Sequence, residues 1–310
     1  MIVRLRKIGT LIVATFLVLA TTAALSGLAY ANLVGRPMAQ APAAPDQKQT
    51  LRLATTTSMQ DSGLLDYILP GFEKANSAKV QVIAVGSGVA LKMGEMGDVD
   101  VLIAHSPAAE DAFMKAGHGS SRTEFAHNYF VIVGPKSDPA GIRGMDKADK
   151  AFRRIYDTKS TFVGRGDNSG TANKEANIWK ATGLPMPDKG MAWYKSTGSG
   201  MGETLRLTDE MNGYTLSDKS TFLQLRKNLP GMEILVDATP DMLNTYDVIV
   251  ISEEKHPGVN AALAQKFLDY MTRPETQAKI RQYGEETVGQ PLFMTGQPVT
   301  IAPQPVPAAA

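Results

Sequence analysis

Short apolar runs rich in β-branched residues alternate with stretches of helical pattern along most of the chain. In the first part, three such runs read LRLAT, KVQVIAV and DVDVLIAHS. Helical patterns follow these runs at residues 61–76, from residue 90, and at residues 107–116. This strand–helix alternation predicts a parallel sheet covered by helices, and therefore an α/β fold.

A second series of the same kind begins at the run NYFVIVGPKSD. It continues with TFVGRGD, AWYKSTGSG, GYTLS and MEILVD, with a helical pattern between each of its first four runs. The run YDVIVIS and two terminal helices, over residues 259–271 and 274–283, end the pattern. Because this last group can return to the first series, the order predicts two lobes on one chain.

We expect each lobe to be a mixed, mostly parallel sheet flanked by helices. The first lobe is predicted over residues 51–128 and 245–293, and the second over residues 129–244. The chain would cross between them near residues 125–135 and 238–247. A cleft between two such lobes is a natural place for a ligand.

The first 41 residues have the layout of a secretory signal peptide, with a basic start, an apolar run over residues 8–25 and small-x-small sites at 29–31 and 39–41. The alternative is an uncleaved membrane anchor, since the apolar stretch is long enough to span a bilayer when its flanks are included. In both cases we expect the folded part to be exported, either to the periplasm or tethered to the membrane.

Proline and alanine are frequent in two stretches at the edges of the pattern. Residues 42–50 are predicted to be a linker, and residues 294–310 a flexible tail. The chain has no cysteine, so disulfides, thiolate metal sites, a cysteine nucleophile and a lipid-anchoring cysteine are all excluded.

The charge balance argues against a nucleic-acid partner. The net charge is +1, but four basic residues and no acidic ones lie in the first 41 positions, which leaves 28 basic against 31 acidic residues in the remainder. A nucleic-acid-binding protein is expected to carry a basic surplus or a stripe of Lys and Arg.

Four loops share one design, in which a strand is followed by a turn rich in Ser, Thr and Gly and then by a helix start. They read TTTSMQDSG (55–63), GSGVAL (86–91), RGDNSGTANKEA (165–176) and TGSGMGETL (197–205). Ligands bind at the carboxyl ends of strands in open α/β sheets, and helix N-termini present free amides to anions. The four loops together predict an anion site built mostly from neutral donors.

Each loop taken singly has an alternative interpretation. Ser, Thr, Asn and Asp before a helix commonly cap it, and glycine there commonly serves the turn. The GSGVAL turn approaches a dinucleotide fingerprint, but Leu91 occupies the position of the third glycine. Arg165 is the one permanent cation among these turns and could bind an oxyanion with two parallel hydrogen bonds. The alternative is a surface arginine paired with Asp167.

Enzymatic motifs are weak in this sequence. The four histidines, at positions 105, 118, 127 and 256, show no HExxH motif or close metal spacing, so a structural role is the simpler interpretation for each. The G-x-S-x-G elbow of serine hydrolases is also lacking. We therefore expect no catalytic residue, no directly bound metal and no cofactor.

Several motifs resemble a known family. The stretches ATTTSMQDSGLLD, VGSGVALKMGEMGDVDVLIAHSPAAEDAFMKAG, VGRGDNSGT, GSGMGETL and GYTLSDKSTF are similar, in this order, to the tungstate-binding proteins of bacterial ABC importers, the TupA family. The resemblance covers residues 51–293. It implies a type II periplasmic binding protein fold that closes on a tetrahedral oxyanion and delivers it to a membrane permease and its ATPase. We expect a monomer.

The resemblance also implies which residues bind the oxyanion. The motifs place it among Thr56, Thr57, Ser58, Ser87, Gly88, Arg165, Ser169, Gly170 and Thr171. Ser199, the amides of residues 200–202 and Tyr214 are further candidates. Asp167 is expected to support Arg165 or to cap the next helix.

Other functions stay open from the sequence. Molybdate, phosphate or sulfate could be the ligand of the same fold, and donor counts do not separate molybdate from tungstate. A phosphate site is expected to include an acceptor for the remaining proton of the ligand. An exported hydrolase with Ser58 or Ser169 as nucleophile and a sensory module are the alternatives from other classes.

Overall fold

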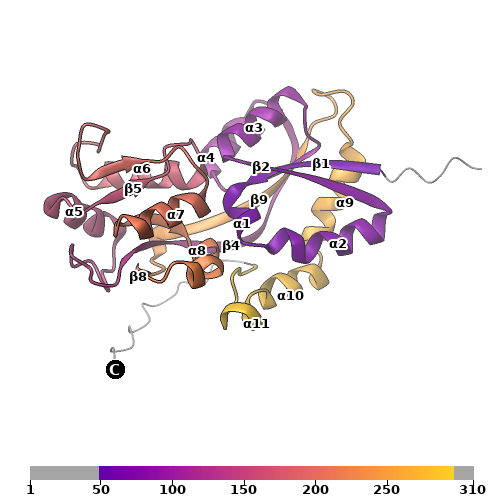
Figure 1. Ribbon diagram of the computed structural model, residues 1–310. Coiled ribbons are helices and arrows are strands. Elements are labelled where there is room, and N and C mark those ends of the chain that lie inside the picture. The colour runs from indigo at the N-terminus through magenta and orange to yellow at the C-terminus, as the bar shows by residue number, and fades with distance from the viewer. Residues whose placement is uncertain (1–48, 297–310) are drawn as a thin grey trace, which may run out of the picture. The chain divides into compact units, whose positions relative to one another are not determined.

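The computed structural model describes residues 49–296, in which strands and helices alternate (Figure 1). The strands are β1 (Gln49–Thr56), β2 (Ala78–Val85), β3 (Val101–Ala104), β4 (Gly119–Pro135), β5 (Phe162–Gly164), β6 (Tyr194–Ser196), β7 (Thr215–Asp218), β8 (Met232–Val236) and β9 (Leu243–Ile251). Seven of them form one sheet in the order β2-β1-β3-β9-β4-β7, with β8 also paired to β4. The other two, β5 and β6, pair with each other.

Most helices occupy connections that the sequence pattern predicts. The helices are α1 (Thr57–Asp61), α2 (Leu64–Asn76), α3 (Ser87–Met96), α4 (Pro107–Lys115), α5 (Ala148–Thr158), α6 (Gly170–Ala181), α7 (Met201–Glu210), α8 (Lys219–Leu225), α9 (Ala261–Thr272), α10 (Pro274–Gln282) and α11 (Glu285–Val288). Of these, α8 and α11 were not predicted. The helix expected over residues 61–76 begins instead as α1, which starts directly at Thr57. A break follows at Gly63, whose φ of 74° lies in the left-handed region that ends a regular helix.

The sheet is mixed. β1 pairs in parallel with β2 and with β3, and β5 pairs in parallel with β6. β9 lies antiparallel between β3 and β4, and β4 is antiparallel to β7 and β8. The predicted α/β class with strands flanked by helices is therefore confirmed, and antiparallel pairs join β4, β7 and β8 to the parallel strands β1, β2 and β3 through β9.

Helices cover both faces of the β1–β3–β9 region. Successive strand residues point to opposite faces of a sheet. Leu53 and Val101 belong to the core cluster that contains residues of α2, α9 and α10. Their neighbours Ala54 and Leu102 pack with residues of α3 and α4. The parallel strands are thus buried from both sides, which is why they read as nearly continuous apolar runs.

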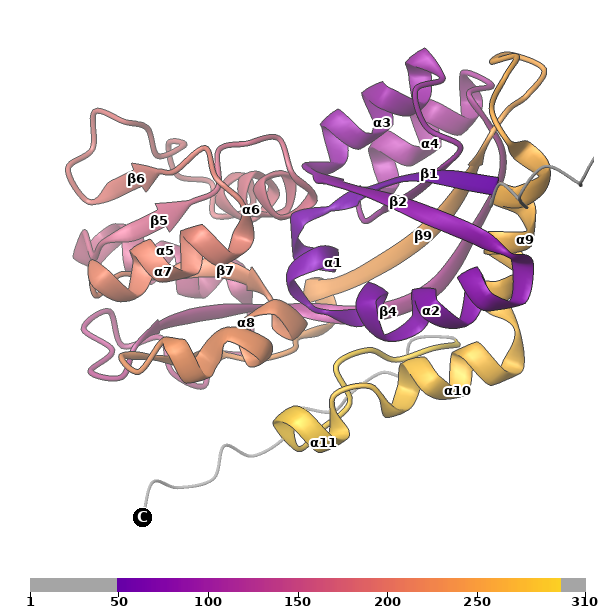
Figure 2. The same ribbon diagram turned by 45° about the vertical axis from the view of Figure 1, so that its right-hand side comes forward.

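β4 changes partners along its length. Its residues 119–129 pair with β9, whereas residues 130–135 pair with β7 and β8. Figure 2 shows this long strand running from the region of α2 past α8. The switch falls inside the crossing expected near residues 125–135, but one core cluster continues across it. The assignment of two lobes remains a prediction.

The ends of the ordered fold differ slightly from the prediction. Gln49 and Thr50, expected in the linker, pair with β2 in strand β1. Met294, expected in the flexible tail, exchanges two backbone hydrogen bonds with His127. The predicted signal peptide, residues 1–41, lies outside the described residues, as do residues 297–310. Among residues 49–296, no helix is long and apolar enough to cross a membrane.

Arg122 of β4 forms ion pairs with three carboxylates in the part of the sheet where β4 pairs with β9. Its guanidinium lies 2.6 Å from Asp247, 3.0 Å from Glu110 of α4 and 2.5 Å from the exposed Asp111. The Glu110 side chain is only 1% exposed. Burial, together with the hydrogen bond and the charge of Asp247, raises the pKa of Glu110 to about 8 despite the opposing effect of Arg122.

This raised pKa predicts a pH-dependent stability. The native state holds a proton on Glu110 that the unfolded chain, with a carboxyl pKa of about 4.3, releases. The contribution is fully present below the unfolded pKa and is lost as the pH rises through about 8. Between about pH 5 and pH 9, the wild-type free energy of unfolding should therefore fall by at least about 1 kcal/mol more than that of Glu110→Gln.

Urea unfolding of both proteins at several pH values measures this difference. Asp111→Asn is the matched control, because Asp111 contacts the same guanidinium but is 74% exposed. Its pH profile should follow that of the wild type. Parallel profiles for the wild type and Glu110→Gln would contradict a raised pKa at Glu110.

Candidate functional site

The neighbouring parallel strands β2, β1 and β3 end at the same edge of the sheet, and the loops that follow them begin there. Thr56 at the end of β1 lies opposite Val85 at the end of β2, and the next residues begin α1 and α3. β3 pairs with β1 in the same direction and ends one residue before His105. This shared register brings the TTTS loop, the GSG turn and His105 to the same place.

The loop after β5 reaches the same place from the second series of elements. A Cβ added to Gly86 would lie 3.2 Å from the Asp167 carbonyl oxygen. A Cβ added to Gly170 would lie 2.7 Å from both the ring nitrogen Nε2 and the carbonyl oxygen of His105. Any larger residue at Gly170 would push these segments apart. The glycine therefore permits the close approach of the RGDNSGT loop to β3.

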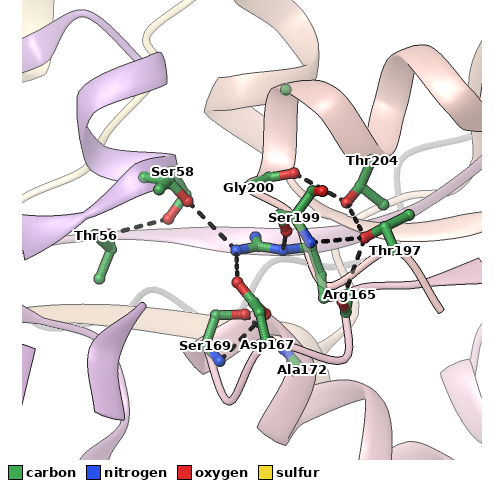
Figure 3. A network of polar contacts seen from close by, with 12 residues as sticks. Thr56, Ser58, Arg165, Asp167, Ser169, Ala172, Thr197, Ser199, Gly200 and Thr204 are labelled. Carbon is green, nitrogen blue, oxygen red and sulfur yellow. Dashed lines mark hydrogen bonds and ion pairs between the residues drawn. The ribbon is translucent and has the colours of Figure 1, made fainter. Parts of the chain in front are cut away.

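Arg165 is buried at the centre of these loops. Its side chain is 1% exposed, and its Nε donates to the Ser199 carbonyl oxygen at 2.8 Å. Its Nη2 donates to Thr57 Oγ1 at 3.3 Å and to Asp167 Oδ2 at 2.5 Å. Figure 3 shows the guanidinium between the loop of Thr56 and Ser58 on one side and the Thr197–Gly200 turn on the other. The alternative of a surface arginine is therefore wrong, although the pairing with Asp167 is present.

Asp167 supports Arg165 and also stabilises the next turn. Its second oxygen, Oδ1, accepts a hydrogen bond from the Ser169 amide at 3.3 Å. Of the two roles that the sequence suggested for Asp167, support of Arg165 is confirmed, whereas the cap of the next helix is Ser169. The pair of Arg165 and Asp167 carries no net charge, so most of the remaining attraction for an anion must come from neutral donors.

Glu175 of α6 binds the backbone of Arg165. This carboxylate accepts from the Arg165 amide at 3.3 Å, from the Tyr194 hydroxyl at 2.9 Å and from the Trp179 indole at 3.3 Å. Burial raises the pKa of Glu175, while these hydrogen bonds and the charge of Arg165 oppose the shift. The three donors fix Glu175, and Glu175 in turn fixes where the arginine side chain leaves the backbone.

Capping accounts for only two of the four helix starts. Thr56 Oγ1 accepts from the Met59 amide at 3.2 Å, and Ser169 Oγ accepts from the Ala172 amide at 3.1 Å. The starts of α3 and α7 follow Gly86 and Gly200, which offer no side-chain cap. The first amides of a helix have no acceptor within it. In α7 the Gly202 amide, one of the further candidates, donates to Asp61 at 3.2 Å.

Two buried hydroxyls at these helix starts have no hydrogen-bond partner among the described residues. They are Ser87 Oγ, at the first position of α3, and Thr171 Oγ1, in the first turn of α6. Both side chains are 0% exposed. An unsatisfied buried polar group costs about 1–3 kcal/mol, so such atoms point to an acceptor that binds there.

The structure brings all nine predicted ligand residues into this region. The TTTS residues are linked to one another by a contact of 3.1 Å between the hydroxyls of Thr56 and Ser58. The region comprises Thr56, Thr57, Ser58, Ser87, Gly88, Arg165, Ser169, Gly170 and Thr171. Whether each contacts a ligand remains a prediction. Tyr214 is not part of the group, because its hydroxyl donates to Asp138 and accepts from the Ala140 amide.

Three further residues lie at this edge: Thr55, which belongs to the TTTS motif but was not among the predicted ligands, and two residues that the sequence missed. Thr55 and Ser106 each carry a further buried hydroxyl without a partner among the described residues, and His105 contacts Ser58 through Nε2 at 3.5 Å. His105 and Ser106 follow a strand and precede a helix in the run LIAHSP, as the four predicted loops do. That position was the available signal, but the run lacks the cluster of Ser, Thr and Gly that marked the others.

The chemistry that this region offers is anion binding. Within residues 49–296, no group of three or more His, Asp or Glu side chains is placed to hold a metal ion. Buried hydroxyls, helix amides and one guanidinium are all donors, and they suit an oxyanion that has only acceptors.

Comparison with known proteins agrees with this geometry. The family model described as the PBP superfamily domain matches residues 39–275. The tungstate-binding protein TupA of Peptoclostridium acidaminophilum is 41% identical over 249 residues, which cover 79% of this chain and 85% of that protein.

Two solved structures are also similar to this chain. One is the tungstate ABC transporter from Geobacter sulfurreducens, 42% identical with a TM-score of 0.69, covering 76% of this chain and 98% of that one. The other is the tungstate-binding protein TupA from Desulfovibrio alaskensis G20, 41% identical with a TM-score of 0.68, covering 80% and 99%. They confirm the periplasmic-binding-protein-like fold and a solute-binding rather than an enzymatic role. The chain therefore belongs to the TupA family, within the PBP superfamily.

Proposed function

We propose that this protein captures tungstate, WO₄²⁻, and delivers it to the permease and ATPase of an ABC importer. The observation that carries the proposal is the pair of unpartnered buried hydroxyls, Ser87 and Thr171, at the starts of two helices beside the buried Arg165. The names of the relatives support tungstate as the oxyanion. Export through the leader at residues 1–41 to the periplasm, and a monomeric state, belong to the same proposal.

The donors match the chemistry of a fully deprotonated oxyanion. Such a dianion offers only acceptors, and Ser87, Thr171 and the first amides of α3 and α6 offer only hydrogen atoms to it. The contacts of Arg165 with Thr57, Ser199 and Asp167 use Nε and Nη2. We assign the remaining nitrogen, Nη1, to the anion. In a site shielded from water, each of these bonds is stronger than at the surface.

The ligand would also hold the two predicted lobes together. Several contacts join residues of the predicted lobes directly, among them Arg165 with Thr57, the Gly202 amide with Asp61, and the Thr221 hydroxyl with the Ser58 carbonyl oxygen. An anion bound by donors from both lobes favours the arrangement in which they meet, because only there does it gain all of its contacts. That arrangement would signal loading to the permease.

The geometry disfavours phosphate among the alternatives. At neutral pH phosphate keeps a proton that needs an acceptor in the site, and Asp167 is the nearest carboxylate to Arg165. Its two oxygens already accept from Arg165 and the Ser169 amide, so a protonated ligand oxygen would have to share one of them. Molybdate has the charge of tungstate and nearly its size, so it is the closest competitor and has to be separated by measurement.

Titration calorimetry tests the proposal with tungstate, followed by molybdate, sulfate and phosphate in competition. We expect tight one-to-one binding of tungstate that molybdate displaces poorly and the other two hardly at all. Arg165→Ala should weaken tungstate binding by about 100-fold or more, because hydrogen bonds to a charged partner contribute about 1.5–3 kcal/mol each. Arg165→Lys keeps the charge but loses the planar guanidinium, so its affinity for tungstate should lie between those of the wild type and Arg165→Ala.

The control for Arg165 is Arg206→Ala on α7, since Arg206 is exposed and pairs only with Glu203 and Glu210 among the contacts described. Its affinity should equal that of the wild type, and circular dichroism checks that all variants are folded. Wild-type affinity in a folded Arg165→Ala protein would refute the role of the guanidinium. No binding of any of the four anions to the wild type would refute the proposed function.

The unpartnered hydroxyls predict opposite effects on binding and stability. Ser87→Ala and Thr171→Val should each weaken tungstate binding about tenfold or more, because each loses a hydrogen bond to a charged ligand. Without ligand, their free energy of unfolding should stay equal or rise, because a buried hydroxyl without a partner is removed.

Thr208→Val provides the matched comparison in α7. The Thr208 hydroxyl is buried as well, but it donates to the Thr204 carbonyl oxygen at 2.6 Å. Its loss should therefore lower stability by about 1 kcal/mol and leave tungstate binding unchanged. If Ser87→Ala and Thr171→Val bind tungstate as the wild type does, the hydroxyls are not ligands.

A further inference from the structure

The imidazole of His105 lies between two loops of the proposed oxyanion site. It is 4% exposed, with Nε2 3.5 Å from Ser58 Oγ and packed against Gly170. On the other side of the ring, Nδ1 lies 2.8 Å from Asn244 Oδ1. The Tyr246 ring stacks on it at 5.0 Å, with 8° between the planes. His105 thus joins the site to a buried polar network behind it.

That network fixes the hydrogen on Nδ1. Asn244 Nδ2 donates to Asp218 Oδ2 at 2.6 Å and to Asn128 Oδ1 at 2.8 Å. Asp218 accepts in addition from the hydroxyl of Tyr246, which leaves it as an acceptor. Asn244 must then present its oxygen to His105, and an oxygen can only accept. In the neutral ring, Nδ1 therefore carries the hydrogen and Nε2 carries a lone pair.

Ser58 has one proton and more than one acceptor for it. The lone pair on His105 Nε2 is one acceptor, and the Tyr246 hydroxyl, whose own proton goes to Asp218, is another. If a dianion takes the Ser58 proton, Nε2 is left as a buried acceptor without a donor, at a cost of about 1–3 kcal/mol. A protonated ring removes this conflict, because Nε2–H then donates to Ser58 Oγ while Ser58 donates to the anion.

Charge acts in the same direction. The charged and titratable groups that face the ring are Asp218, Arg165, Asp167 and Tyr246. Burial lowers the pKa of His105, Arg165 adds to this effect, and the bond to Asn244 and the charges of Asp218 and Asp167 oppose it. The ring is therefore neutral near pH 7. A dianion beside the neutral pair of Arg165 and Asp167 adds two negative charges, and an imidazolium would offset one of them.

We propose that capture of the oxyanion is coupled to the uptake of one proton by His105 at Nε2, an inference that rests on the proposed function. The proton comes from solvent and forms the Nε2–H bond, and the anion stays a dianion. Affinity is then highest at low pH. It falls as the pH rises, by up to about tenfold per pH unit, between the pKa of His105 without the anion and its pKa with the anion.

The proton count is measured by calorimetry of the purified protein with tungstate at several pH values between about 6.5 and 8, each in two buffers that differ in protonation enthalpy. The dependence of the observed heat on the buffer gives the number of protons taken up per anion bound. We expect a value approaching one for the wild type. Tungstate binding without proton uptake would overturn this inference alone, whereas no tungstate binding would overturn the proposed function with it.

Three variants assign the proton to a residue. His105→Gln can donate to Ser58 without being charged, so we expect it to bind tungstate with no proton uptake and no pH dependence. Asp167→Asn removes the carboxylate that pairs with Arg165 and could itself take a proton, and uptake should persist in it. His256→Gln, at a histidine that pairs with His118 far along the chain from these loops, should behave as the wild type.

Uptake that persists in His105→Gln, or that disappears in Asp167→Asn alone, would overturn the assignment. Should His105→Gln fail to fold, nitrogen NMR of the wild-type histidine rings gives the same answer. Tungstate should move the Nε2 resonance of one buried histidine from the neutral to the protonated position. Four unchanged rings on saturation with tungstate would overturn the inference.

Discussion

A guanidinium that is removed from water needs fixed acceptors around it, and the loops of this protein are arranged to meet that need at Arg165. Ser199 and Thr57 supply oxygens from two different turns, and Asp167 supplies the opposite charge. Glu175 holds the backbone from which the side chain extends. Because these partners come from distant parts of the chain, burying one side chain fixes the positions of three loops relative to one another.

The neutral ion pair explains why so many uncharged donors gather beside it. A free arginine would attract any anion, whereas a paired one leaves discrimination to hydroxyls and amides whose geometry is set by helix starts. Ser87 and Thr171 stay without protein partners there, and the protein bears that cost in its fold. A site for a ligand with only acceptors is expected to carry such a cost, because its donors lack partners until the ligand binds. The polar network behind His105 connects this site to buried donors and acceptors in the core.

The sequence predicted what depends on local pattern. The α/β alternation, the four strand-to-helix loops and the single cation Arg165 follow from residues that are close together in the chain. The sequence could not show that β4 changes partners after Tyr129, because strand pairing is a long-range property. It offered Tyr214 as a further candidate for the site, but Asp138, 76 positions away, accepts from that hydroxyl. His105 was missed because its partner Asn244 lies 139 positions away.

Crystallographic location of the metal tests the central claim most directly. Tungsten scatters anomalously at its absorption edge, so crystals of the protein grown with tungstate would mark the anion without any assumption about its ligands. The account predicts one strong anomalous peak within hydrogen-bonding reach of the Ser87 and Thr171 hydroxyls and the Arg165 guanidinium. A peak elsewhere, with these three groups left without contact to it, would contradict the account.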